Sequence, residues 1–253
     1  MVGRASVGAW VRCFHPLGEA RVRLVCFPHA GGSASAYHLL SAGLAEDGVQ
    51  TLAVQYPGRQ DRHREACVER VDDLVDAVLR ELAPELGDGL PVGLLGHSMG
   101  AVLAFEVARR LEEDGRGPVV LFASGRQAPS LPWPAPGTPS LRDADDALLV
   151  SELRLLSGGD ARVLEHPGLL RLALPALRAD YRMLENYAYV PGPKLGRPIV
   201  ALAGDRDPRV AVGSVALWEQ ETRAGFELRV LPGGHFFIDE QLSEVLKVIS
   251  SRL

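Results

Sequence analysis

Short apolar runs recur along the chain, and a glycine or proline turn closes each of them. Six of these runs have the length and the Val, Leu and Phe content of buried strands: Val22 to Phe27, Thr51 to Val54, Val92 to Leu95, Val119 to Ala123, Ile199 to Ala203 and Leu228 to Leu231. Most are followed by a stretch with helical spacing. Because continuous apolar strands that alternate with helices are typical of a parallel sheet covered on both faces, the pattern predicts an α/β fold.

Two of the intervening stretches have clear helical periodicity. Apolar side chains recur at three- and four-residue spacing from Val68 to Leu82, and Pro84 closes that helix. The stretch from Ala101 to Glu113 is apolar around its first two turns and charged from Glu106 onward. Such a distribution suits a helix that packs against a sheet.

The alternation of strands and helices is interrupted between Gln127 and Val190. Five prolines between residues 129 and 139 precede two leucine-rich helical stretches. We expect the leucines of these stretches to be buried, because their faces are too apolar to be left in water: Leu148, Leu149, Leu153, Leu156, Leu169, Leu170, Leu172, Leu174 and Leu177. From the pattern alone, the inserted helices form either a lid over a site or a further packing layer.

Composition narrows the class of protein. The 253 residues carry 27 basic and 32 acidic side chains, and 47% of them are hydrophobic, which predicts one globular domain over residues 1–253. With no block of like charge, nucleic-acid binding is not expected. The longest stretch without a charged residue, Leu24 to Ala45, contains proline and glycines and does not suit a membrane span. The N-terminus lacks the apolar run of a secretory signal, so we expect a cytoplasmic protein.

Nothing in the sequence favours a metal or a cofactor. The three cysteines are an odd number without C-x-x-C spacing, so we expect reduced thiols and no cysteine-based metal site. Asp205 and Asp207 form a D-x-D pair, but no clustered third and fourth ligand accompanies them. We therefore expect neither a bound metal nor a cofactor.

The strongest chemical signal is Gly96-His97-Ser98-Met99-Gly100, which directly follows one predicted strand and precedes an apolar helix. This is a G-x-S-x-G motif in the strand-to-helix context of a nucleophile elbow. The two glycines allow a turn so sharp that the serine hydroxyl points out of the carboxyl end of the sheet. We expect Ser98 to be a nucleophile and His97 to have a packing role.

A serine nucleophile needs a histidine base and an acid that orients it. His235 follows the strand that ends at Leu231, and Asp205 and Asp207 follow the strand that ends at Ala203. All of these positions fall at the carboxyl edge of a parallel sheet, in the order Ser, Asp, His of the α/β hydrolases. We favour Asp207 as the acid because it lies further into its loop; Asp205 is the alternative, or else caps the turn through its own backbone.

An oxyanion hole needs two backbone donors. The N–H of Met99, the residue after the nucleophile, is one candidate, and the glycine-containing loop after Phe27 offers Ala30 as the second. The rival interpretation of that loop is a phosphate cradle, but neither G-x-x-x-x-G-K-[ST] nor G-x-G-x-x-G is present.

Taken together, several strings resemble the type II thioesterases, the stand-alone α/β hydrolases that accompany polyketide synthases and nonribosomal peptide synthetases. The strings cover nearly the whole chain: Phe27 to Ala34, Gln55 to Arg62, Gly96 to Ala101, Leu174 to Tyr181, Gly204 to Pro208 and Gly233 to Phe236. In that family the serine, acid and histidine correspond to Ser98, Asp207 and His235. The resemblance also implies that residues 127–190 are a lid.

What the resemblance implies for function is an editing hydrolase that removes stalled acyl groups from the phosphopantetheine arm of an acyl or peptidyl carrier protein. We expect it to act as a monomer. The alternatives are a carboxylesterase or lipase, a product-releasing thioesterase, and a non-catalytic binding module. The string from Gln55 to Arg62 has no catalytic role that we can derive, and we expect a structural turn with Arg59 and Arg62 in surface ion pairs.

Overall fold

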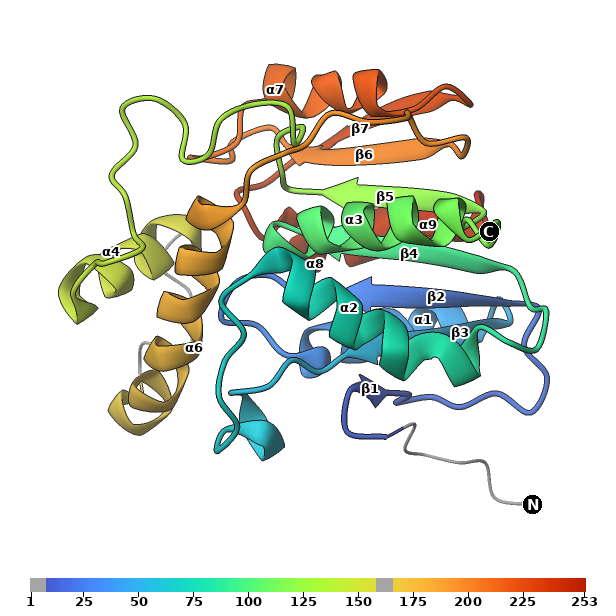
Figure 1. The fold of residues 1–253 in the computed structure, drawn as a ribbon, viewed down its shortest axis with the longest axis horizontal. Coiled ribbons are helices and arrows are strands. Elements are labelled where there is room, and N and C mark those ends of the chain that lie inside the picture. Colours follow the sequence, from blue (N-terminus) through green and yellow to red (C-terminus); the bar gives the residue numbers. More distant parts are fainter. Residues whose placement is uncertain (1–7, 158–165) are drawn as a thin grey trace.

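The protein is described from a computed structural model, over residues 8–157 and 166–253. Its centre is a sheet of seven strands in the order β1-β3-β2-β4-β5-β6-β7, in which only β1 pairs antiparallel to its neighbour (Figure 1). The strands are β1 (Val11–Arg12), β2 (Val22–Phe27), β3 (Val49–Val54), β4 (Val92–His97), β5 (Val120–Ser124), β6 (Ile199–Gly204) and β7 (Phe226–Leu231). The mostly parallel sheet confirms the predicted α/β class.

Helices connect the strands and cover the sheet. The α-helices are α1 (His38–Ala45), α2 (Val71–Leu82), α3 (Met99–Glu113), α4 (Asp146–Leu156), α6 (Pro167–Asn186), α7 (Val212–Ala216), α8 (Phe237–Glu240) and α9 (Leu242–Ser250). Short 3-10 helices span Ala34–Tyr37, Gln60–Arg62, Ala83–Glu85 and Leu217–Glu221. Within the described ranges, no helix is both long enough and apolar enough to cross a bilayer.

Alternation along the strands produces two cores. In β2, for example, Val25 and Phe27 face the core shared with α2 and α3, whereas Leu24 and Cys26 face the core shared with α1 and α9. All four side chains are fully buried. Because both faces of the central strands are covered, their sequences contain continuous apolar runs rather than an alternation of apolar and polar residues.

The inserted segment, which lies between β5 and β6, carries α4 and α6. Both helices lie beyond the carboxyl ends of the strands (Figure 1). They pack on each other through a third apolar cluster: Leu141, Ala144, Leu149, Leu174, Leu177 and Tyr181. The expectation that the leucines here are buried is wrong for Leu148, Leu169 and Leu172, and Leu172 is 60% exposed. These three point away from the cluster because one helical face suffices to pack the pair.

Candidate active site

The serine of the elbow sits in a conformation that only the surrounding backbone can impose. Ser98 has φ 55° and ψ −116°, a positive φ that non-glycine residues rarely adopt. Its N–H donates to the carbonyl of Ser124 (2.8 Å) in β5. A Cβ at Gly96 would lie 2.0 Å from the Gly100 carbonyl oxygen, and one at Gly100 would lie 1.8 Å from that of Phe27. The two glycines are therefore required for the tight turn.

The histidine and one of the two candidate acids meet at the carboxyl edge. His235 Nδ1 lies 2.7 Å from Asp207 Oδ2, and the side chains of both are buried. The other oxygen of Asp207 accepts from the N–H groups of Arg209 (2.9 Å) and Val210 (3.1 Å). This carboxylate is thus fixed on both oxygens, as a group that orients a histidine must be.

Asp205 turns elsewhere. Its Oδ1 accepts from the N–H of Gly233 (2.8 Å), so it joins the acid loop to the histidine loop. The expectation that it caps its own turn is wrong, because the neighbouring loop offers a free donor. Asp205 is also exposed, in contrast to Asp207.

The predicted oxyanion loop is a tight turn beside the serine. The N–H of Gly32 donates to the His29 carbonyl (2.9 Å), and Gly31, with φ 72°, provides the positive φ at the third position of the turn. Met99 begins α3, where a backbone N–H has no acceptor within its own helix. Ala30 and Ser98 line the same cavity.

That cavity is narrow and lies between the carboxyl edge of the sheet and the inserted segment. Ser98 and His235 line it from the carboxyl edge, and Leu153, Leu177 and Tyr181 line it from α4 and α6. A wider, more open pocket shares His29, Ala30, Leu153, Leu177 and Phe236 with it and continues toward Ala173 and Glu240. Four of these five shared residues are apolar, so the cavity at Ser98 adjoins an apolar surface between the inserted helices and the core.

Two further histidines crowd the site without adding charge. The ring of His97 lies 5.2 Å from that of His235, and the ring of His29 lies 4.9 Å from that of Phe236. Burial lowers the pKa of His29 to about 4, and it lowers the pKa of His97 well below its usual value. Both rings are neutral near pH 7. His97 also shares a hydrogen bond with Ser124 Oγ (2.9 Å), consistent with a packing role.

An ion pair in the cavity wall was not predicted from the sequence. Arg209, just after the acid, donates through Nε to Glu152 of α4 (2.9 Å), and its Nη2 bonds the other oxygen of the same carboxylate. Both residues line the cavity. No spacing signal links positions that lie 57 residues apart, so only the fold reveals this contact between α4 and the acid loop.

The prediction of surface ion pairs for Arg59 and Arg62 is wrong. Both residues are buried. Arg59 pairs with Asp180 of α6, and Arg62 donates to the Gln55 carbonyl (2.8 Å) while it pairs with Glu65 at the edge of the buried region. Asp180 of the inserted helix α6 covers Arg59, whereas the guanidinium carbon of Arg62 lies 4.1 Å from the centre of the Trp10 ring.

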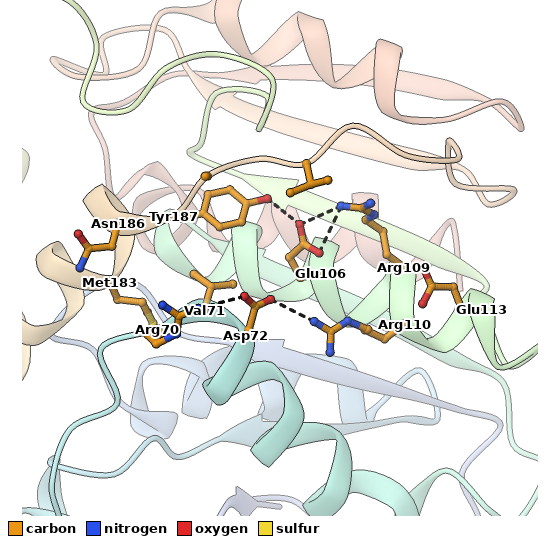
Figure 2. A pocket seen from close by; sticks show the side chains of 12 residues that line it. Arg70, Val71, Asp72, Glu106, Arg109, Arg110, Glu113, Met183, Asn186 and Tyr187 are labelled. Carbon is orange, nitrogen blue, oxygen red and sulfur yellow. Dashed lines mark hydrogen bonds and ion pairs between the residues drawn. The ribbon is translucent and has the colours of Figure 1, made fainter.

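A second cavity, of about 410 Å³, lies between α2, α3 and the end of α6. Figure 2 shows that several of its polar side chains bond one another: Tyr187 and Arg109 bond Glu106, and Arg110 bonds Asp72. None of the candidate catalytic residues lines it. Over residues 8–157 and 166–253, no group of three or more His, Cys, Asp or Glu side chains is arranged to hold a metal ion.

The fold is that of an α/β hydrolase, and a serine, a histidine and an aspartate gather at the carboxyl edge of its sheet. The chain belongs to the thioesterase family, since the profile of the thioesterase domain matches residues 22–253. It is accordingly a thioester hydrolase.

Individual relatives agree with this family. Thioesterase PikA5 of Streptomyces venezuelae is 47% identical over 247 residues, which are 97% of this chain and 86% of that protein. The solved structure of the type II thioesterase BorB, from the borrelidin biosynthetic cluster, matches with a TM-score of 0.89 and 42% identity over 99% of both chains. The type II thioesterase YbtT, from the yersiniabactin NRPS/PKS pathway, matches with a TM-score of 0.81 and 29% identity over 96% of this chain and 98% of its own.

Proposed function

We propose that this enzyme removes aberrant or stalled acyl groups from the phosphopantetheine thiol of carrier proteins in polyketide or nonribosomal peptide synthesis. The observation that supports the proposal most is the 2.7 Å contact between His235 and Asp207, at an edge where His235 and Ser98 line one cavity. The type II thioesterases among the relatives support the class of substrate. In this proposal, the inserted segment is a lid that shelters the pantetheine arm.

In the proposed mechanism, Ser98 Oγ attacks the thioester carbonyl as His235 Nε2 accepts its proton. Asp207 holds the imidazole through Nδ1, and the N–H groups of Met99 and Ala30 donate to the oxyanion. The intermediate collapses when the C–S bond breaks, and the proton on His235 passes to the thiolate that leaves. Water, deprotonated by His235, then attacks the acyl-serine, and a carboxylic acid is released as Ser98 regains its proton.

Intact-mass spectrometry of an acyl-loaded carrier protein tests the proposal. Acetyl-, propionyl- and hexanoyl-carrier are each incubated with the native enzyme or with Ser98→Ala. We expect free carrier thiol with the native enzyme alone. If the carriers stay acylated while an oxygen ester of the same acyl group is hydrolysed, the carboxylesterase alternative is correct instead.

The monomeric state and the cytoplasmic location stay predictions from the sequence.

A further inference from the structure

Two segments without an assigned role meet at the oxyanion loop, residues 28–32. One is the turn after β3 that contains Gln55 and Arg59, and the other is the middle of α6, which contains Asp180. Arg59 Nη2 bonds Asp180 Oδ2, and their side chains are 5% and 1% exposed. This ion pair is therefore enclosed between the core and the inserted helix.

Asp180 also holds the loop directly. The same Oδ2 atom accepts a hydrogen bond from the N–H of Gly31 (2.7 Å). That N–H belongs to the peptide unit between Ala30 and Gly31, so the bond fixes the orientation of the backbone on the carboxyl side of Ala30. The carboxylate thus acts on the residue whose own N–H is proposed to bind the oxyanion.

Side chains from the turn after β3 hold the loop from the other side. Arg59 Nε donates to the carbonyl of Gly32 (3.1 Å), and Gln55 Oε1 accepts from the N–H of Ala34 (2.9 Å). The hydroxyl of Tyr56 donates to the carbonyl of Pro28 (3.3 Å). Every one of these bonds ends on the backbone of the oxyanion loop or of the residues just beyond it.

Stability alone does not account for this arrangement. The removal of two charges from water costs about as much as their attraction returns, and apolar side chains of the same volume commonly stabilise a protein equally well. What apolar side chains cannot supply is an acceptor for the Gly31 N–H. The ion pair therefore has a geometric effect that packing would not reproduce.

We propose that Asp180, held by Arg59, is a positioning residue that sets the oxyanion loop for catalysis. Because Asp180 lies on α6, the oxyanion hole is complete only when this inserted helix is docked on the core. The inference rests on the proposed roles of Ser98 and Ala30. It adds that the inserted segment shapes the reacting centre as well as covering it.

A pair of variants separates positioning from stability. In Asp180→Leu, the Arg59 charge is left buried without an opposite charge beside it, so both the melting temperature and kcat should fall. In Arg59→Met/Asp180→Leu, no unpaired charge remains, so we expect the melting temperature to recover in part; the Gly31 N–H and the Gly32 carbonyl still lack their partners. Gly31 still lacks its acceptor, so kcat should stay between about 10-fold and 10²-fold below native, with KM little changed.

The affinity for an alkyl trifluoromethyl ketone is a measurement that would not change if Asp180 had only a structural role. Ser98 adds to this carbonyl to give a hemiketal oxyanion in the hole, whereas a non-hydrolysable thioether of the same chain makes no oxyanion. The double variant should lose affinity for the ketone by the same factor as kcat and keep its affinity for the thioether. A double variant that regains native kcat together with its melting temperature would overturn the proposal.

Two further variants are matched controls. Asp180→Asn keeps an oxygen that can accept from Gly31, so it should retain more kcat than Asp180→Leu although it too breaks the ion pair. Arg178 lies on α6, as Asp180 does, but away from the oxyanion loop. Arg178→Gln removes its contact to Asp146 of α4 and should leave kcat and ketone affinity at native values. If the native enzyme leaves acyl-carriers intact, the proposed function fails, but ketone affinities still report on positioning because they require only a reactive Ser98.

Discussion

The two halves of the site differ in what holds them. The elbow around Ser98 is fixed by its own glycines and by the neighbouring strand β5, through bonds such as Ser98 N–H to the Ser124 carbonyl. The oxyanion loop is fixed by side chains from distant parts of the chain, among them Asp180, which follows Gly31 by 149 residues. The nucleophile is thus built into the sheet, whereas the oxyanion hole depends on an inserted helix.

This difference implies that a change in the elbow can abolish the chemistry while the fold persists. A change in the loop should instead affect catalysis and the docking of α6 together. Variants in each half test that contrast.

Replacement of the nucleophile should have the greatest effect on rate and almost none on stability. We expect Ser98→Ala to lower kcat on the order of 10⁶-fold, as removal of the serine does in subtilisin. Its melting temperature should stay at the native value, because the tight turn rests on backbone and glycines. Deacylation assays and thermal melts measure the two quantities, and a loss of less than about tenfold in kcat would remove Ser98 from the mechanism.

The acid is the next largest contribution. Asp207→Asn should lower kcat on the order of 10⁴-fold, by analogy with the corresponding change in a serine protease, because the amide favours the wrong tautomer of His235. Asp205→Asn is the matched control two residues away, and its bond to Gly233 survives as an amide oxygen contact. Steady-state kinetics of both variants decide which aspartate is the catalytic acid. An equal loss of kcat in the two variants would contradict the assignment of Asp207.

A bulky residue in the oxyanion loop should reduce both rate and stability. A Cβ at Gly31 would lie 3.1 Å from Leu177 Cδ1 of α6, in a backbone conformation with φ 72°. We expect Gly31→Val to lower kcat on the order of 10²-fold.

Gly115→Val is the control for Gly31→Val. Gly115 also has φ 72°, but a Cβ at this position would meet no other atom within 4 Å. The variant should therefore cost stability without lowering kcat. Native kcat in Gly31→Val would place the second oxyanion donor elsewhere.

A different kind of effect concerns the dependence of stability on pH. His29 and His97 have lowered pKa values because they are buried, so the unfolded chain binds more protons than the native protein below about pH 6.5. Stability should therefore fall as the pH drops from about 6.5 toward 4, by up to about 1.4 kcal/mol per pH unit for each histidine. Urea titrations at several pH values measure this slope.

Two variants assign the pH slope to the two halves of the site. His97→Asn removes the histidine at the end of β4, and His29→Gln removes the one in the oxyanion loop. Each should flatten part of the slope. An unchanged slope in both variants would mean that other groups cause the acid sensitivity.

The same contrast explains how much could be predicted from the sequence. The strands, the elbow at Ser98 and the positions of Asp207 and His235 follow from local patterns: apolar runs, the two glycines of the motif, and loops at strand ends. Parallel strands bring their carboxyl ends to one edge, so local order was enough to predict that these residues meet there.

The remaining contacts could not be predicted, because they depend on how the inserted helices dock. Arginine is usually found at the protein surface, and Arg59 is buried because α6 covers it. Glu152 and Arg209 lie on elements whose relative placement no periodicity encodes. Leu172 is the opposite case: the helical pattern predicted that this apolar residue is buried, but it is exposed on the docked helix.

The wide separation between Asp180 and its partners also bears on the order of folding. Asp180 lies 121 positions from Arg59 and 149 positions from Gly31, so its contacts with them require closure of a long loop, whose entropic cost grows with length. The elbow, in contrast, is assembled from neighbouring strands. During refolding of a variant in which Trp10 and Trp133 are replaced by Phe, we expect the fluorescence of Trp218, fully buried beside α3, to reach its native value before hydrolytic activity returns. The interval between the two signals would be the time that α6 needs to find the oxyanion loop.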